Sequence, residues 1–212
     1  MKHKKADCAE VGIVAHHYWY DEDITEEQLI EEVEDLNDHY DGIIVQLPLP
    51  EHINSKLVGA AIKPEKDVDG FRKDSPYRCC TPGGIMWYLT EGCEWNPEGK
   101  TVLVIGRSDI VGKPMAEYMT QANATVILAH RHTQRLSELI AAADLIVCAV
   151  GKANFLNCYA IHVPVVDVGI NFKDGKLVGD CFNTEDRDVT PVPGGVGLLT
   201  RCQLLTNVIK AK

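Results

Sequence analysis

The sequence has little positive charge. Its 212 residues include 21 Lys and Arg against 31 Asp and Glu, which gives a formal net charge of −10. Binding along a nucleic acid or on an anionic membrane needs a basic surface. The composition therefore argues against nucleic-acid and membrane partners, and leaves room for a local basic pocket only.

The sequence also lacks the marks of a membrane span, a secretory leader and a zinc site. No apolar run approaches the roughly 20 residues that cross a bilayer, and no apolar leader opens the chain. The eight cysteines form no C-x-x-C pair, and no two histidines have zinc spacing. We expect free thiols in a reducing cytoplasm and no metal site.

What the second half of the chain does have is an alternation of strand-like and helix-like segments. Strands are expected at 101–105, 124–129, 145–150 and 165–168, and helices at 114–121 and 136–142. This alternation is typical of a parallel sheet with helices on both faces. The predicted fold class is α/β, with a Rossmann-type doubly wound parallel sheet.

The first half of the chain predicts a smaller α/β domain. Thr25 and Gln28 have the spacing of a capping box, which indicates the start of a helix there. The other expected elements are a helix over 2–11 ended by Gly12, a short strand and loop at 13–20, a strand at 42–47, a helix at 57–62, a loop at 64–77, a helix at 84–91 after a break at Pro82-Gly83, and a last helix at 198–210.

A glycine-containing loop, Gly106 to Pro114, joins the first strand of the second half to its helix. Gly106 permits a tight turn, Pro114 suits a first helical turn, and a helix start offers free N–H groups to a phosphate. The loop is not G-x-G-x-x-G, and strand–loop–helix units also occur in α/β proteins without a dinucleotide. The loop alone therefore leaves cofactor binding open.

The end of the second strand bears on the choice of cofactor. NAD sites usually have an acid about 20 residues past the glycines, whereas this sequence continues Ala129-His130-Arg131-His132-Thr133. The guanidinium groups of Arg131 and of Arg107 in the loop can pair with a 2′-phosphate, which predicts NADP. The alternative is a solvated strand end without a ligand.

Several blocks, in order along the chain, resemble the bifunctional methylenetetrahydrofolate dehydrogenase/methenyltetrahydrofolate cyclohydrolase family. The blocks are DGIIVQLPLP at 41–50, KDVDGF at 66–71, CTPGG at 80–84, GRS at 106–108, VGKP at 111–114, DVGIN at 167–171, GD at 179–180 and TPVPGGVG at 190–197. One block could arise by chance, but several in the family's order are specific.

The resemblance implies a folate-binding catalytic domain over 1–90, completed by the helix at 198–212, and an NADP-binding domain over 91–197, with the active site in the cleft between them. It also implies NADP-dependent oxidation of 5,10-methylenetetrahydrofolate and hydrolysis of the methenyl product to 10-formyltetrahydrofolate. The substrates are then tetrahydrofolate one-carbon derivatives, and the assembly is a homodimer.

The resemblance gives catalytic roles to three side chains. Lys4 falls on the family's active-site lysine, which can transfer protons when part of it is neutral near pH 7. Gln46 would orient that amine, and Asp69 would bind the pterin ring. From the residues alone, Lys4 is one of several lysines near the chain start and Asp69 is a turn residue before Gly70.

Binding residues follow from the same resemblance. Expected cofactor contacts are Gly106, Arg107, Ser108, Val111, Gly112, Pro114, His130, Arg131, Thr133 and Ile170. Expected substrate contacts are Gln46, Leu47, Pro48, Asp69, Pro193, Gly194 and Gly195.

The sequence departs from the family at its start, where the family's opening helix, its first strand and a tyrosine four residues before the lysine are missing. This N-terminal shortening leaves two alternatives open. One is a dehydrogenase without the cyclohydrolase step, and the other is a non-catalytic module that binds NADP or folate. Arg131 stands where the family often has serine, which favours 2′-phosphate binding.

Overall fold

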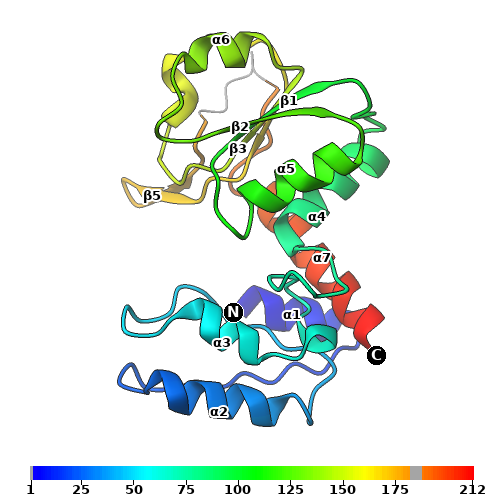
Figure 1. The fold of residues 1–212 in the computed structure, drawn as a ribbon, viewed down its shortest axis with the longest axis vertical. Helices are drawn as coiled ribbons and strands as arrows, with labels where there is room; N and C mark the ends of the chain where they lie inside the picture. Colours follow the sequence, from blue (N-terminus) through cyan, green and yellow to red (C-terminus); the bar gives the residue numbers. More distant parts are fainter. Residues whose placement is uncertain (1, 182–187) are drawn as a thin grey trace. The chain divides into compact units, whose positions relative to one another are not determined.

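A computed structural model describes residues 2–181 and 188–212 (Figure 1). The chain divides into two compact units. The first unit is Met1–Cys80 with Arg201–Lys212, and the second is Thr81–Thr200. Two helices, α4 (Cys80–Trp87) and α7 (Val196–Ala211), have residues in both units. Within the described part of the chain, no helix has the length and apolar composition of a membrane span.

The second unit contains a four-stranded parallel sheet. Its strands are β1 (Thr101–Ile105), β2 (Thr125–Ala129), β3 (Leu145–Cys148) and β4 (Val165–Asp167), in the order β2-β1-β3-β4. The chain moves outward from β1 to β2 and then returns to the other side of β1 to form β3. The carboxyl ends of β1 and β3 are therefore a topological switch point, where open α/β sheets bind ligands.

Helices cover both faces of this sheet, which confirms the predicted α/β class with a doubly wound sheet (Figure 1). Val102 and Val104 face a core that includes residues of α4, α5 (Gly112–Gln121) and the start of α7. Leu103 and Ile105 point the other way, into a core with α6 (Leu136–Ala141) and the 3₁₀ helix η3 (Phe155–Cys158). Successive side chains of β1 thus pack into two different hydrophobic cores, one on each face of the sheet.

A hairpin of β5 (Asn171–Lys173) and β6 (Lys176–Val178) follows β4 and was not predicted. Its turn is Asp174-Gly175, with φ values of 51° and 73°. Positive φ at both central residues is the requirement of a type I′ turn, and Asp-Gly is among the best sequences for it. The Asp-Gly pair is a sequence signal for this turn, but strands of only three residues on either side show too short a pattern to be recognised.

Two local predictions for the first unit are confirmed. Its α1 (Lys2–Glu10) is terminated by Gly12 at the C′ position, where φ is +77° and the N–H of Ile13 donates to the carbonyl of Cys8 at 2.8 Å. This is the 6→1 bond of a Schellman motif, which needs a left-handed residue. The helix α2 (Glu26–Leu36) begins with the expected capping box of Thr25 and Gln28.

The strands predicted at 42–47 and 13–20 are wrong. Residues 13–20 have no regular structure, and 42–47 contribute one isolated bridge, Ile43 to Asp67. A strand needs a partner backbone along its length, and among the described residues Ile43 donates only to the carbonyl of Lys66. The apolar pattern still marked buried positions, because Ile43 packs in the core of α2 and α3 (Ser55–Ala61).

The expected break at Pro82-Gly83 is also wrong, because α4 begins earlier, at Cys80. Pro82 lies in the first turn of that helix, where its missing N–H removes no hydrogen bond. The helix then passes into a π-helical turn, η2 (Tyr88–Gly92). The loop at 64–77 holds one 3₁₀ turn, η1 (Pro64–Lys66), and the remaining elements begin and end close to their predicted limits.

Candidate functional site

In the first unit, Lys4 of α1 lies beside Gln46. The Nζ atom of Lys4 donates to Oε1 of Gln46 at 3.1 Å, although 42 positions separate the two residues. The Nε2 atom of Gln46 donates to the carbonyl of Leu47 at 3.0 Å. That second bond holds the amide so that its oxygen faces the amine. The structure therefore brings together the first two residues of the expected catalytic set.

Asp69, the third member of this set, is buried in the same unit, with 9% of the residue exposed. Burial raises the pKa of Asp69, and the positive charge of Lys4 opposes that rise. Lys4 is thus close enough to Asp69 to stabilise its ionised carboxylate electrostatically. The thiol of Cys80 lies near Asp69. Burial raises the pKa of this thiol, and the negative charge of Asp69 raises it further.

Two polar residues that sequence reasoning missed hold the segment around Asp69. The buried carboxylate of Asp67 accepts the N–H of Arg72 at 2.8 Å. From α7, Nδ2 of Asn207 donates to the carbonyls of Val68 at 2.8 Å and Arg78 at 2.9 Å. The signal for Asn207 was an amide three residues after the buried Leu204, on the buried face of the last helix, where an amide needs partners.

The expected folate-contacting residues Leu47 and Pro48 follow Gln46 directly. Their peptide bond is cis, Leu47 is partly buried and Pro48 is exposed. The first unit thus presents an amine, an amide and a buried carboxyl next to an exposed proline. These groups can hold a polar heterocycle and move a proton.

In the second unit, the loop after β1 is packed too tightly for side chains at its two glycines. A Cβ on Gly106, where φ is +117°, would lie 2.2 Å from the carbonyl oxygen of Ala149. A Cβ on Gly112 would lie 2.0 Å from the carbonyl oxygen of Gly106. Only glycine permits this close backbone turn, which is the feature that lets a dinucleotide approach such a loop. The residues present therefore fit the cofactor that the family implies.

Ser108 changes one expectation about this loop. The expected free N–H groups at the start of α5 are not free, because Oγ of Ser108 accepts those of Val111 and Gly112 at 3.2 and 3.3 Å. The carbonyl of Ser108 accepts the N–H of Lys113 as well. Ser108 thus satisfies N–H groups at the start of α5, whose N-cap residue is Val111 and whose first turn includes Pro114. Its hydroxyl hydrogen remains available as a donor, since both bonds use oxygen lone pairs.

The end of β2 forms a tight turn. The N–H of His130 donates to Oγ1 of Thr133 at 2.8 Å, and the N–H of Thr133 donates back to the carbonyl of His130 at 2.8 Å. Arg131 is exposed at the tip of this turn, and its Nε donates to Nε2 of His132. Because β2 pairs in parallel with β1, the turn leaves the same edge of the sheet as the loop with Arg107.

The remaining expected residues lie in loops that follow β4. Ile170 is 68% exposed and lies three residues after β4, directly before β5. Pro193 and Gly194 are exposed, the Val192-Pro193 bond is cis, and φ of Gly194 is +101°. A Cβ on Gly195 would lie 2.4 Å from the carbonyl oxygen of Pro191, so this turn is also restricted to glycine.

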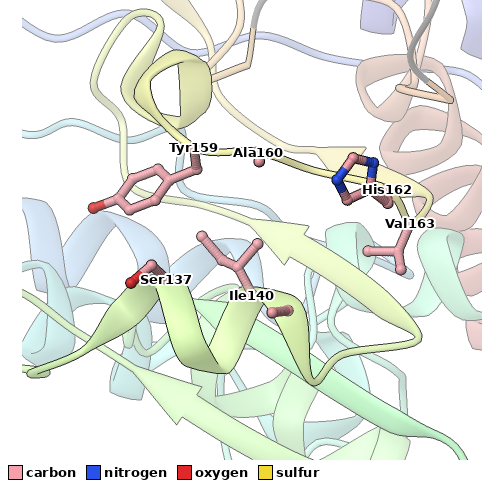
Figure 2. Close-up of a pocket in the computed structure, with 7 residues that line it drawn as sticks. Ser137, Ile140, Tyr159, Ala160, His162 and Val163 are labelled. Atoms are coloured by element: carbon pink, nitrogen blue, oxygen red, sulfur yellow. The ribbon is translucent and has the colours of Figure 1, made fainter.

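One other feature of the second unit lies outside the expected site. A pocket between α6 and residues 159–163 is lined by Ser137, Ile140, Ala141, Tyr159, Ala160, His162 and Val163 (Figure 2). None of these was an expected site residue. Among residues 2–181 and 188–212, no group of three His, Cys, Asp or Glu side chains is placed to hold a metal ion.

Comparison with known proteins gives family matches over both units. The family model described as tetrahydrofolate dehydrogenase/cyclohydrolase, catalytic domain, matches residues 1–69. The model described as tetrahydrofolate dehydrogenase/cyclohydrolase, NAD(P)-binding domain, matches residues 79–212. The bifunctional protein FolD of Acetivibrio thermocellus is 42% identical over an alignment of 226 residues, which covers 98% of this chain and 79% of the relative.

Solved structures give the same answer. The bifunctional FolD enzyme, methylenetetrahydrofolate dehydrogenase/cyclohydrolase, from Campylobacter jejuni superimposes with a TM-score of 0.92 at 41% identity and covers 99% of this chain and 81% of its own. The FolD of Trypanosoma brucei, solved with NADP cofactor and inhibitor, has a TM-score of 0.90 at 31% identity and covers 99% and 80%.

Proposed function

This chain belongs to the tetrahydrofolate dehydrogenase/cyclohydrolase family, and we propose that it catalyses both reactions for which the family is named. It oxidises 5,10-methylenetetrahydrofolate to the 5,10-methenyl cation with NADP and hydrolyses that cation to 10-formyltetrahydrofolate. The observation that carries the proposal is the Lys4–Gln46 hydrogen bond beside the buried Asp69.

In the hydrolysis, Lys4 transfers the protons. Water attacks the methenyl carbon, loses a proton, and the ring opens when one nitrogen leaves. Oε1 of Gln46 accepts a hydrogen bond from the Nζ atom of Lys4, which fixes the direction of the amine. Asp69 accepts hydrogen bonds from the pterin ring, and Leu47 with Pro48 forms an apolar contact with the folate.

In the oxidation, NADP supplies a nicotinamide that accepts a hydride from the methylene carbon. This chain contributes the binding groups. The backbone of Gly106 and Gly112 would let the phosphates approach, and the hydroxyl of Ser108 would donate to a phosphate oxygen while its oxygen accepts the N–H groups of Val111 and Gly112. Arg131 and Arg107 pair with the 2′-phosphate, because a guanidinium matches phosphate geometry.

The remaining contacts follow the same division. Val111 and Pro114 border the loop, His130 and Thr133 shape the turn of Arg131, and Ile170 lies against the nicotinamide. The turn of Pro193, Gly194 and Gly195 holds the folate. We also propose a folate domain of residues 1–90 with 198–212, an NADP domain of 91–197, a homodimer and a cytoplasmic location. The free cysteines support a reducing compartment.

Two assays and one binding experiment test the proposal. NADPH formation from 5,10-methylenetetrahydrofolate measures the oxidation, and decay of supplied 5,10-methenyltetrahydrofolate measures the hydrolysis. Both should be catalysed. Oxidation without hydrolysis would identify a monofunctional dehydrogenase. Calorimetric binding of NADP and of a folate analogue without either activity would identify a binding module.

A further inference from the structure

A buried carboxylate, Asp180, binds the loop that follows β3. Its Oδ2 accepts the N–H groups of Val150 at 2.7 Å and Gly151 at 2.9 Å. Its Oδ1 accepts the N–H of Lys152 at 2.8 Å and Nδ2 of Asn171 at 2.9 Å. Asp180 is 0% exposed, so these four donors replace the water that a carboxylate needs.

A second buried carboxylate, Asp167 at the end of β4, fixes the position of Asp180. Oδ1 of Asp167 accepts the N–H groups of Gly169 at 2.9 Å and Asp180 at 3.0 Å, and Oδ2 accepts that of Cys181 at 2.8 Å. The N–H of Asp167 itself donates to Oγ1 of Thr190 at 2.9 Å. One aspartate therefore holds the backbone of the other.

The loops held in this way are those of the proposed cofactor site. Val150 and Gly151 follow Ala149, whose carbonyl leaves no room for a Cβ on Gly106. Ile170 lies between Gly169, which is bound to Asp167, and Asn171, which is bound to Asp180. The side chain of Asp180 thus connects the loop after β3 with the turn that carries Ile170.

The packing leaves no freedom in this connection. A Cβ on Gly169 would lie 2.3 Å from Oδ1 of Asp180, and a Cβ on Gly179 would lie 1.9 Å from Oδ2 of Asp167. The β5–β6 hairpin returns the chain from Asn171 to Asp180, with Asn171 paired to Val178. The hairpin that the sequence did not predict is therefore what brings Asp180 back to the sheet.

From this arrangement we propose that Asp180 is a positioning residue for the nicotinamide half of NADP. It holds the loop at 150–152 and the Ile170 turn in one fixed relation, so that the cofactor binds without having to order them. Preorganised loops improve affinity because binding then costs less conformational entropy. The inference rests on the proposed function, since it requires that NADP binds to this unit.

Asp180→Asn in the full chain is the test. An amide offers one oxygen in place of two, and each oxygen of Asp180 accepts two N–H donors, so at least two of these donors face an NH₂ group and lose their acceptor. We expect NADP affinity, measured by calorimetry, to fall about 10-fold. Adenosine 2′,5′-bisphosphate, which lacks the nicotinamide, should lose no more than about twofold. Hydrolysis of methenyltetrahydrofolate without NADP should persist, because Lys4 and Gln46 lie in the other unit.

A swap distinguishes positioning from general destabilisation. Asn171→Asp alone sets two carboxylates against each other, whereas Asn171→Asp with Asp180→Asn restores the side-chain hydrogen bond. We expect the double variant to bind NADP more tightly than either single variant. Asp144→Asn is the matched control: Asp144 accepts one backbone N–H, from Thr101 at the opposite edge of the sheet, and its loss should leave NADP affinity unchanged.

The outcomes separate the two ideas. If the unaltered protein binds no NADP, the proposed function is wrong. If it binds NADP and folded Asp180→Asn binds it equally well, the inference is overturned while the function stands. Equal losses for NADP and for the bisphosphate, or no recovery in the double variant, would also overturn the positioning role, because the effect would then be a general loss of structure.

Discussion

The amine of Lys4 is bound to the side-chain oxygen of Gln46, and the amide nitrogen of Gln46 is bound to its own neighbour, Leu47. This order fixes which end of the amide faces the lysine. An amide reversed at this position would present NH₂ to an ammonium group, and two donors cannot pair. The polarity of Gln46 is therefore set by the chain, before any substrate binds.

Replacing Lys4 should stop the hydrolysis. In Lys4→Met, no group replaces the proton-transferring amine, and the rate of methenyltetrahydrofolate decay should fall at least about 100-fold. Lys5→Met is the control, because Lys5 is the exposed neighbour on the same helix. The decay is followed by the loss of methenyl absorbance. Hydrolysis at an unchanged rate in Lys4→Met would remove Lys4 from the mechanism.

Replacing Arg131 should change the choice of cofactor. Arg131→Asp removes a charge-assisted contact with the 2′-phosphate and adds a like charge, so NADP should bind about 10-fold more weakly or worse, with little effect on NAD. Calorimetry with each cofactor measures the two affinities. Arg135→Asp is the control, since Arg135 is also exposed but pairs with Glu138. If the variant binds NADP and NAD each with the same affinity as the unaltered protein, Arg131 does not recognise the phosphate.

Local signals in the sequence were sufficient for helix ends and for the parallel sheet. The capping box at Thr25 and the glycine at position 12 act within one turn of their own helix. A few consecutive residues therefore contain all the interactions that set these helix ends. The strand predicted at 42–47 failed for the opposite reason. Its apolar pattern requires burial, which Ile43 has, but a ladder depends on a partner that no local pattern specifies.

The candidate site was only partly accessible to sequence reasoning. The hydrogen bond between Lys4 and Gln46 could be expected from the family resemblance, but no rule of sequence spacing predicts it. The capping by Ser108 was missed because a hydroxyl before a helix and a phosphate-binding hydroxyl have the same sequence signature. Asp167 and Asp180 stood in recognised blocks, but their roles depend on a hairpin that returns one to the other.

Stability should depend on pH through Asp69. Burial raises the pKa of Asp69 in the folded state, so the folded chain holds this proton more tightly than the unfolded chain. The resulting stability is fully present below the unfolded carboxyl pKa of about 3.9 and is lost as pH rises through the raised folded value. Above that raised value, ionisation of the buried Asp69 costs stability.

Asp69→Asn tests this cost. The variant should melt at a higher temperature than the unaltered protein at pH 7, and the difference should shrink as the pH falls toward 4, while affinity for a folate analogue is lost. Asp74→Asn is the control of opposite sign, because the hydrogen bond from Arg72 lowers the pKa of Asp74. Thermal unfolding across this pH range measures both. A lower melting temperature for Asp69→Asn at pH 7 would mean that the carboxylate is stabilised by its surroundings.

The amide of Asn207 should be needed for the Asp69 segment. Asn207→Leu removes the amide donor from the carbonyls of Val68 and Arg78, and because the thiol of Cys80 still donates to the Val68 carbonyl, each lost hydrogen bond should cost about 0.5–1.5 kcal/mol. Denaturant unfolding should show the loss in the midpoint. Thr206→Ala is the control on the same helix, because the hydroxyl of Thr206 donates to its own helix carbonyl, that of Cys202, and is exposed. An Asn207→Leu protein as stable as the unaltered one would show that other groups satisfy those carbonyls.

Two glycine-to-alanine changes should have opposite signs. Alanine generally stabilises a helix, and Gly59 in α3 has no atom within 4 Å of an added Cβ, so Gly59→Ala should add about 0.4–1 kcal/mol. Gly112 also begins a helix, but its Cβ would lie 2.0 Å from the carbonyl oxygen of Gly106. The backbone must then move, which costs about 1–3 kcal/mol and outweighs the helix preference.

Because the displaced segment is the proposed phosphate loop, Gly112→Ala should weaken NADP binding as well as stability, whereas Gly59→Ala should leave NADP binding unchanged. Urea unfolding and calorimetry on the two variants measure both effects, and a Gly112→Ala protein that gains stability would show that the loop can open without cost.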